Sequence, residues 1–537
     1  MKSIHSLLMV LVTSALYSLT ACTDRGDSER SEGEAADTGG TAVVALATDL
    51  DHANILATNS RYTQEVLRYV LFLPLVHYDE KLSYQPALAE SYESHGDTAI
   101  TFKLRRDVFW HDGQQTNAYD VAFTFQRAAD TATAFPNADW LIGWGAPQVL
   151  DSFTVRFPLE RMADPLAGVA LLPIMPRHLL ESTPAGQMAQ AGFNRKPIGN
   201  GPFKFVEYRA NDRWVFETNE RYPEELGKPR LRGLVLRVIP EASAQAIELQ
   251  TGSVHLATGI PVEQYQPLDA DSSLRGIPRD SRQYGFIPWN ARRPPLNDAR
   301  VRRALTMAID RAGIVRNLRG GFGEPATGPV GKYHWAYDES AAPLPYSPDS
   351  ARALLAQAGL RDRNGDNLLE RADGSTWQIE LKVPSGSAFM RDAAELIRSN
   401  LAAVGVRVVP RTLDFNTIGE DLTSSERNFD AALMGWENDL RLNFHDMFHS
   451  SALNGPLQFA SYSNPAVDSI IDQAAAEPDR ARSIPLWHRF QSILRADQPW
   501  TFIHFYPDLY VAREELQGTE MDIRGAFVNV TRWWIRK

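Results

Sequence analysis

Residues 98–127 read TAITFKLRRDVFWHDGQQTNAYDVAFTFQR, and this stretch contains a strand, a turn and a helix in close succession. Alternating apolar residues from Thr98 to Leu104 predict a half-buried strand. His111, Asp112 and Gly113 then indicate a tight turn, because Asp and Gly favour turn conformations. From Asp120 onward the apolar residues follow helical spacing. The stretch therefore predicts mixed α/β structure.

Short strands and helices alternate along the rest of the chain in the same way. We expect further strands at residues 42–47, 203–208, 213–218 and 234–239. We expect further helices at residues 63–73, 241–251, 298–318, 350–358 and 393–404. The elements show no fixed-period repeat, so the pattern favours an α/β fold over a solenoid or a propeller.

The composition is that of a globular protein with more than one domain. The chain is 44% hydrophobic and 10% aromatic. Its length of 537 residues exceeds the size at which a single core keeps growing. The net charge of −11 and the lack of a basic stripe argue against a nucleic-acid partner. The single cysteine excludes a disulfide within the chain and cysteine-rich zinc motifs.

The N-terminal residues predict an export signal. An apolar run from Leu7 follows Lys2 and ends in Leu19-Thr20-Ala21-Cys22, and it is too short to span a bilayer stably. This pattern resembles a bacterial lipoprotein signal (1–22), which implies a lipid on Cys22 that anchors the protein at the periplasmic face of a bacterial membrane. The alternative is an ordinary secretory signal cleaved near Ala21. Residues 23–40 contain no large apolar side chain, so we expect a disordered linker there.

Motifs of common enzymes are missing from the sequence. It contains no Gly-x-Ser-x-Gly, no His-Glu-x-x-His and no Walker loop. Gly199-Asn200-Gly201 is followed by Pro202, which lacks a backbone donor, so we interpret it as a turn before a strand and not as a phosphate site. These absences weaken the hydrolase and nucleotide-binding interpretations without excluding them, and we expect no cofactor.

Two groups of residues are weak candidates for metal ligands. The first matches positions 1, 3, 5, 9 and 12 of a calcium loop, with Leu368 at position 7: Asp362, Asn364, Asp366, Glu370 and Asp373. Asn367 stands where such a loop prefers glycine, and Asp is a poorer final ligand than Glu, so we favour a plain acidic loop.

The second candidate is a pair of histidines. His445 and His449 would share one face of a helix and could chelate a transition metal. Their aromatic neighbours Phe444 and Phe448 favour packed or hydrogen-bonded histidines instead.

Several long blocks together identify the chain as similar to the family 5 extracellular solute-binding proteins, which serve ABC importers of oligopeptides, dipeptides and nickel complexes. The blocks are residues 84–92 (YQPALAESY), 101–105 (TFKLR), 109–113 (FWHDG), 120–125 (DVAFTF), 197–203 (PIGNGPF), 300–305 (RVRRAL), 308–311 (AIDR) and 435–439 (GWEND). The resemblance implies the type II periplasmic binding protein fold, with two α/β lobes joined by a hinge, a cleft between them and an extra domain inserted in the first lobe.

The resemblance also implies a division of the body into segments. We expect the first lobe at 41–75, 196–285 and 500–537, the inserted domain at 76–195, and the second lobe at 286–499.

In peptide-binding members of this family, a Trp followed three residues later by Asp lies in the cleft, and the carboxylate meets the ligand's α-ammonium group. Trp436 and Asp439, after Gly435, match that pattern. Alternatively, Asp439 caps the following segment. Arg441 departs from the pattern and either binds a ligand carboxylate or neutralises Asp439. Arg391 is a weak candidate for binding a C-terminal carboxylate.

The resemblance implies a receptor that binds peptides without turning them over. The expected partners are a peptide, an ABC permease with its ATPase, and the membrane through the lipid, and we expect a monomer. One alternative is a nickel-chelate receptor that uses His445 and His449. A periplasmic hydrolase or an adhesin on the same fold is the other.

Overall fold

The computed structural model describes residues 39–536. The predicted signal, Cys22 and residues 23–38 of the predicted linker lie outside the described residues. Within residues 39–536, no helix is both long and apolar enough to cross a membrane.

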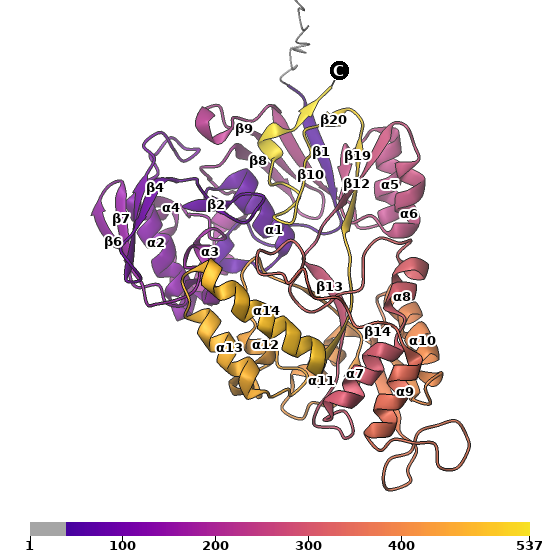
Figure 1. Ribbon diagram of the computed structural model, residues 1–537. Coiled ribbons are helices and arrows are strands. Elements are labelled where there is room, and N and C mark those ends of the chain that lie inside the picture. Colours follow the sequence, from indigo (N-terminus) through magenta and orange to yellow (C-terminus); the bar gives the residue numbers. More distant parts are fainter. Residues whose placement is uncertain (1–38, 537) are drawn as a thin grey trace, which may run out of the picture. The chain divides into compact units, whose positions relative to one another are not determined.

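The first lobe is built on a seven-stranded sheet (Figure 1). The strands in spatial order are β12 (Leu274–Arg279), β19 (Asp508–Arg513), β11 (Leu256–Ala257), β1 (Thr41–Leu46), β10 (Gly233–Val238), β9 (Arg213–Thr218) and β8 (Phe203–Arg209). The predicted strand at 42–47 is the central strand β1, which pairs in parallel with β10 and β11. The lobe also contains α1 (Arg61–Val66), the π-helical turn Leu67–Leu71, α5 (Ala242–Thr251), α6 (Val262–Asp269), β20 (Leu516–Gln517) and β21 (Trp534–Ile535).

The quoted stretch forms part of a second sheet, in the order β4 (Ala89–Ser94), β5 (Ala99–Leu104), β7 (Thr154–Pro158), β6 (Gln148–Asp151). After β5 the chain turns at Gly113, whose φ of +95° favours glycine, and enters α2 (Ala118–Ala129). Asn117 and Asp120 form a capping box that starts this helix. The Trp110 indole also donates to Asp120 over 3.2 Å, which ties the turn to the helix.

The inserted region shares its core with the first lobe. One cluster of buried side chains includes Phe102 and Phe157 of the small sheet together with Leu234 of the seven-stranded sheet. The remaining strands and α-helices of the region are β2 (Val76–Tyr78), β3 (Tyr84–Pro86), α3 (Leu166–Val169) and α4 (Arg177–Leu180).

The second lobe contains two three-stranded sheets and most of the longer helices. One sheet has the order β15 (Arg407–Leu413), β14 (Gln378–Pro384), β16 (Ala431–Ala432), and the other β17 (Met434–Glu437), β13 (Gln283–Pro288), β18 (Trp500–Phe505). The helices are α7 (Ala299–Ala308), α8 (Arg311–Leu318), α9 (Pro348–Gln357), α10 (Ala388–Ala402), α11 (Phe415–Thr423), α12 (His445–Phe448), α13 (Pro465–Ala475) and α14 (Arg480–Asp497).

The single helix expected at 298–318 is two helices, α7 and α8. The break occurs at Asp310, whose side chain accepts a hydrogen bond from the Gly313 amide at 2.8 Å and so caps a new helix. The apolar spacing continues through the break, which is why periodicity alone predicted one helix.

Two chain segments cross between the lobes and form the hinge. β12 continues through residues 280–282 into β13, and β18 continues through residues 506–507 into β19. Each pair of strands is antiparallel within its own sheet, so the two crossings run side by side. The Ser281 hydroxyl donates to the Tyr506 carbonyl over 2.6 Å and connects them. These crossings lie within several residues of the expected boundaries 285/286 and 499/500, and the division of the chain into segments remains a proposal.

Candidate ligand site between the lobes

The GWEND block lies at the edge of the second lobe beside the hinge. Gly435 and Trp436 belong to β17 and pair with Gly285 and Tyr284 of β13. Directly after the strand, the Asn438 amide donates to the Arg282 carbonyl at 3.1 Å, and Arg282 belongs to a crossing segment. The block therefore lies directly against the hinge.

Asp439 carries a charged carboxylate at this position. One oxygen accepts the Leu440 amide at 2.6 Å, and the other accepts Arg441 Nε at 2.9 Å. Burial alone would raise the pKa of this carboxyl, but the guanidinium groups of Arg441 and Arg282 hold the pKa below its ordinary value. Its side chain is 31% exposed, and each oxygen has a second lone pair. Asp439 is thus an anion that can accept a further donor.

Arg441 connects Asp439 with the inserted region. Its guanidinium group pairs with the Asp139 carboxylate and also donates to the Asp139 carbonyl at 3.2 Å. The structure therefore pairs Arg441 with both Asp439 and Asp139.

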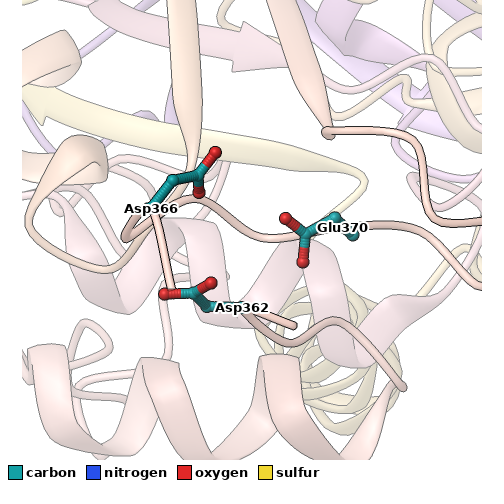
Figure 2. A group of neighbouring side chains, drawn as sticks. All are labelled: Asp362, Asp366 and Glu370. Carbon is teal, nitrogen blue, oxygen red and sulfur yellow. The ribbon is translucent and has the colours of Figure 1, made fainter. Parts of the chain in front are cut away.

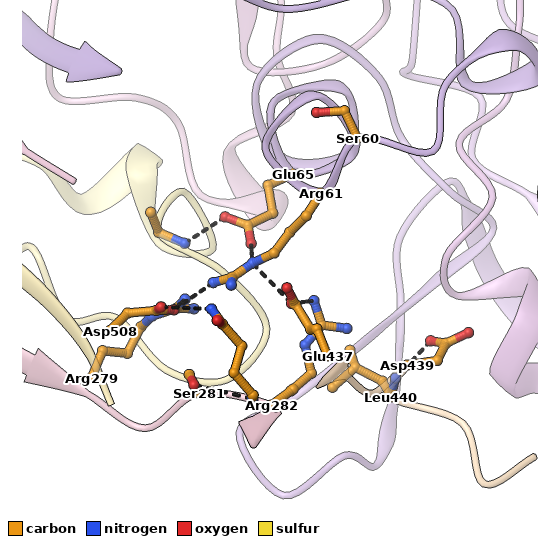
Figure 3. Close-up of polar contacts among 12 residues, drawn as sticks. Ser60, Arg61, Glu65, Arg279, Ser281, Arg282, Glu437, Asp439, Leu440 and Asp508 are labelled. Carbon is orange, nitrogen blue, oxygen red and sulfur yellow. Dashed lines mark hydrogen bonds and ion pairs between the residues drawn. The ribbon is translucent and has the colours of Figure 1, made fainter. Parts of the chain in front are cut away.

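A group of six charged residues, which we call the interlobe charge cluster, lies next to Asp439 (Figure 3). Its members are Arg61, Glu65, Arg279, Arg282, Glu437 and Asp508. Arg61, at the start of α1, contacts Glu65 at 3.0 Å, Asp508 at 2.6 Å and Glu437 at 3.1 Å. Arg282 contacts Glu437 at 2.9 Å, and Arg279 pairs with Asp508. Because Arg61 belongs to the first lobe and Glu437 to the second, this pair joins the lobes directly.

The sequence did not reveal the cluster. Arg61 and Glu65 are four positions apart on one helix, whereas Arg61 and Asp508 are separated by 447 positions. Only the strands and the helix that carry them bring the side chains together. Residues such as Arg61 give no local signal, because a lone arginine near a helix start is usually on the surface.

Two cavities lie near this region, one beside Arg441 and one at the hinge, and no residue of the GWEND block lines either of them. One, of about 350 Å³, is lined by Arg441 and residues 442–446 of the second lobe and by residues 162–165, 167 and 168 of the inserted region. The other, of about 370 Å³, is lined by Ser281, Tyr333 and Tyr506. Both are near the lower end of the volumes typical of small-ligand sites, about 300 to 1,000 Å³.

Gly435 and Arg391 have different surroundings. A Cβ atom added at Gly435 would meet the Met390 side chain at 3.6 Å and the Tyr506 hydroxyl at 3.7 Å, so glycine leaves this edge of β17 open. Arg391, the next residue after Met390, is exposed and donates to the Ser385 carbonyl. The structure does not pair Arg391 with Asp439 or with the interlobe charge cluster.

The two histidines are neighbours, with their rings stacked 4.6 Å apart. Helix α12 ends at Phe448, so His449 lies just beyond it. The Ser451 hydroxyl is 3.0 Å from His445 Nε2 and 2.8 Å from His449 Nδ1, and His449 Nε2 is 3.4 Å from Asp472. His445 also lines the 350 Å³ cavity.

In the acidic loop, the structure brings Asp362, Asp366 and Glu370 together. The Asn364 side-chain amide donates to Asp366 at 3.2 Å. Asp373, expected at position 12, is not in this group and instead accepts hydrogen bonds from Ser375.

Comparison with known proteins places the chain among solute-binding proteins. Residues 83–454 match the family model of the bacterial extracellular solute-binding proteins, family 5. The oligopeptide-binding protein AppA of Bacillus subtilis is 29% identical over 546 residues, covering 100% of this chain and 99% of that protein.

Solved structures agree with this assignment. AppA in complex with a nonapeptide superimposes with a TM-score of 0.77 at 28% identity, covering 94% of this chain and 100% of the other. NikZ of Campylobacter jejuni in complex with Ni(L-His) gives 0.78 at 25% identity, covering 92% and 99%.

Proposed function

This chain belongs to family 5 of the bacterial extracellular solute-binding proteins, and from that membership we propose that it captures peptides between its lobes for an ABC importer. The observation that carries the proposal is Asp439, a partly exposed carboxylate beside the hinge whose pKa is lowered by two arginines. A carboxylate held charged in a closing cleft stabilises a cation there, and every unmodified peptide carries one at its N-terminus.

In this proposal the ligand's ammonium group and Arg441 compete for Asp439. Arg441 is shared between Asp439 and Asp139, so it keeps a counter-ion when an ammonium takes its place. The exchange avoids leaving an uncompensated charge in a partly buried site, which would be costly. Arg441 can alternatively stay and bind the ligand's carboxylate, and the substitution below separates the two roles.

The volume of the cavity beside Arg441 favours short peptides in this arrangement of the lobes. Arg441, the partner of Asp439, lines a space of about 350 Å³, which suits a dipeptide or a tripeptide better than a nonapeptide, and a nonapeptide would require the lobes to separate. The Arg61–Glu437 and Arg441–Asp139 pairs both oppose that separation.

A metal-chelate receptor is the second candidate. It is supported by the likeness to NikZ and by the place of His445 on the wall of the cavity that Arg441 also lines. It predicts that ligand binding depends on nickel and disappears in a His445→Ala, His449→Ala double variant. A hydrolase on this fold would convert a peptide pool into products, and we expect no turnover.

The proposal includes a location and partners. A lipid on Cys22 would keep the protein at the periplasmic face of the membrane, where a permease with its ATPase accepts the ligand from a monomeric receptor. Globomycin-sensitive processing, with loss of lipid labelling in Cys22→Ser, is the expected result. An unlabelled wild-type protein would instead indicate ordinary secretion.

The first experiment measures the melting temperature of protein that has been stripped of ligand by unfolding and refolding. Binding to the native state raises apparent stability by RT ln(1 + [L]/Kd). We expect di- and tripeptides to raise the melting temperature, and their N-acetylated forms to fail. Equal shifts with both forms would contradict the role of Asp439.

Arg441→Met separates the two roles of this arginine. If Arg441 only neutralises Asp439, the variant binds peptides with free and amidated C-termini more tightly, and to the same extent. If Arg441 binds the ligand's carboxylate, only the free-acid peptide loses affinity, by about tenfold or more.

A further inference from the structure

We propose that the loop between α9 and β14 binds a calcium ion through Asp362, Asp366 and Glu370. One carboxylate oxygen from each residue lies within 4.8 Å of the others. Figure 2 shows the three carboxyl groups around a common space, with Glu370 facing the two aspartates. The loop is in the second lobe and contains none of the residues assigned above to the peptide.

The buried carboxylate of Glu370 carries the inference. Its residue is only 2% exposed, in contrast with the exposed Asp362 and Asp366. One Glu370 oxygen accepts the Arg363 amide at 2.7 Å. The other is buried and has no hydrogen-bond partner among residues 39–536. Burying a carboxylate oxygen without a partner is unfavourable, so this atom is available to a ligand that the chain itself does not supply.

The loop also lacks a counter-ion of its own. Arg361, Arg363 and Arg371 are close in sequence, yet in the part of the chain that the structure describes no side-chain nitrogen of Lys, Arg or His lies within 4.0 Å of the three carboxylates. Three like charges this close repel one another. A bound cation would remove the repulsion and satisfy Glu370 at the same time.

Backbone amides position the Asp362 carboxylate by hydrogen bonds and leave lone pairs on its oxygens for a cation. The two Asp362 oxygens accept the amides of Gly365 at 2.7 Å and Asn367 at 2.9 Å. Asn367 has φ = +66°, the left-handed conformation that a calcium loop requires at position 6 and that asparagine tolerates. The glutamate at position 9 joins the group in place of Asp373, so the ligands come from a loop shorter than the twelve-residue register.

The chemistry of the ligands selects the ion. Carboxylate oxygens suit hard cations, and calcium accepts six to eight oxygens at about 2.3–2.6 Å in irregular geometry, whereas magnesium demands a near-ideal octahedron. Three carboxylates leave several positions for carbonyl oxygens or water. Calcium sites of extracellular modules have dissociation constants of about 10⁻⁴ to 10⁻³ M, and we expect a value in this range.

The test is a calcium titration of purified, chelator-treated protein by calorimetry, together with its melting temperature. Terbium provides a second readout, because buried Trp377, whose amide donates to the Leu369 carbonyl at 2.7 Å, can sensitise its emission. We expect saturable binding, a rise in melting temperature with calcium, and terbium emission that calcium displaces. No binding and no thermal shift at about ten times the upper constant would overturn the proposal, as would an equal response to magnesium.

Three variants locate the site. Asp366→Asn and Glu370→Gln should each weaken calcium binding by about tenfold or more, whereas Asp373→Asn, a matched acidic residue outside the group, should leave it unchanged. Asp366 is exposed, so its variant keeps the test valid if Glu370→Gln does not fold. Unchanged calcium affinity in Asp366→Asn would overturn the proposal. Peptide binding serves as an independent check that each variant is native.

Discussion

Two groups of carboxylates within residues 39–536 differ in their counter-ions. In the interlobe charge cluster, Glu65, Glu437 and Asp508 each contact an arginine of the chain. In the loop between α9 and β14, the carboxylates of Asp362 and Glu370 approach each other without a cationic side chain in the described range 39–536. The cluster can therefore serve as a junction between lobes, whereas the loop depends on a cation from solution.

Asp439 is intermediate between these two groups. It has an arginine partner, but that arginine is shared with Asp139 and the carboxylate remains 31% exposed. A ligand-binding carboxylate needs a counter-ion that the ligand can replace, and Arg441 is such a counter-ion.

The largest effect is expected from Arg61→Met. This substitution removes one cation from three carboxylates, of which Glu65 is 2% exposed and Asp508 is 10% exposed. Leaving buried charges unpaired costs about 3–5 kcal/mol of unfolding free energy. Urea denaturation measures the loss. Arg352→Met is the control, because its pair with Asp349 is exposed on both sides and should change stability by no more than about 0.5 kcal/mol. Equal losses in both variants would contradict the structural role of the cluster.

Replacing a carboxylate by its amide should change the unfolding free energy in opposite directions in the two groups. Glu437→Gln removes a counter-ion from Arg61 and Arg282 and should lower the unfolding free energy by about 1–3 kcal/mol. Asp366→Asn, measured in chelator, relieves repulsion and should raise it by a few tenths of a kcal/mol, about the size of exposed charge effects. Denaturation of both variants under identical calcium-free conditions measures the two changes in unfolding free energy. A loss of more than about 1 kcal/mol in Asp366→Asn would show that this carboxylate has a stabilising partner within the chain.

A change of pH should have a smaller effect, on the affinity for a dipeptide, for each pH unit. The lowered pKa of Asp439 keeps its carboxylate charged above pH 5, so affinity for a dipeptide should change little between about pH 5 and 7. Above about pH 8 the free ammonium loses its proton, and affinity should fall by up to about tenfold per pH unit. Calorimetric titrations across this range measure the profile. A tenfold loss between pH 7 and 5 would mean that the arginines do not hold the carboxylate in its charged form.

Local signals predicted much of the fold. The strand at 98–104 and the helix after Asp120 were predictable because their turn and cap residues are adjacent in sequence. The break between α7 and α8 also had a local signal, the capping Asp310, but the continuing apolar spacing concealed it.

The site was less predictable than the fold. Asp439 was proposed through family resemblance, since a lone aspartate has no distinguishing pattern. The junction around Arg61 depends on strands β12 and β19 pairing across 229 positions, as Arg279 and Asp508 do. The burial of Glu370 depends equally on the folded chain, because the Leu369 amide donates to the distant Gly405 carbonyl at 2.9 Å. None of these contacts follows from spacing along the sequence.

The central claim, that Asp439 binds the ligand's ammonium group, is tested most directly by a double-mutant cycle. Calorimetry would compare a dipeptide with its N-acetylated form on wild-type protein and on Asp439→Asn. We predict that acetylation weakens binding to the wild type by about 30- to 100-fold, corresponding to roughly 2–3 kcal/mol, and binding to the variant by less than about threefold. An equal loss in both proteins would show that Asp439 does not contact the amine, and would contradict the account.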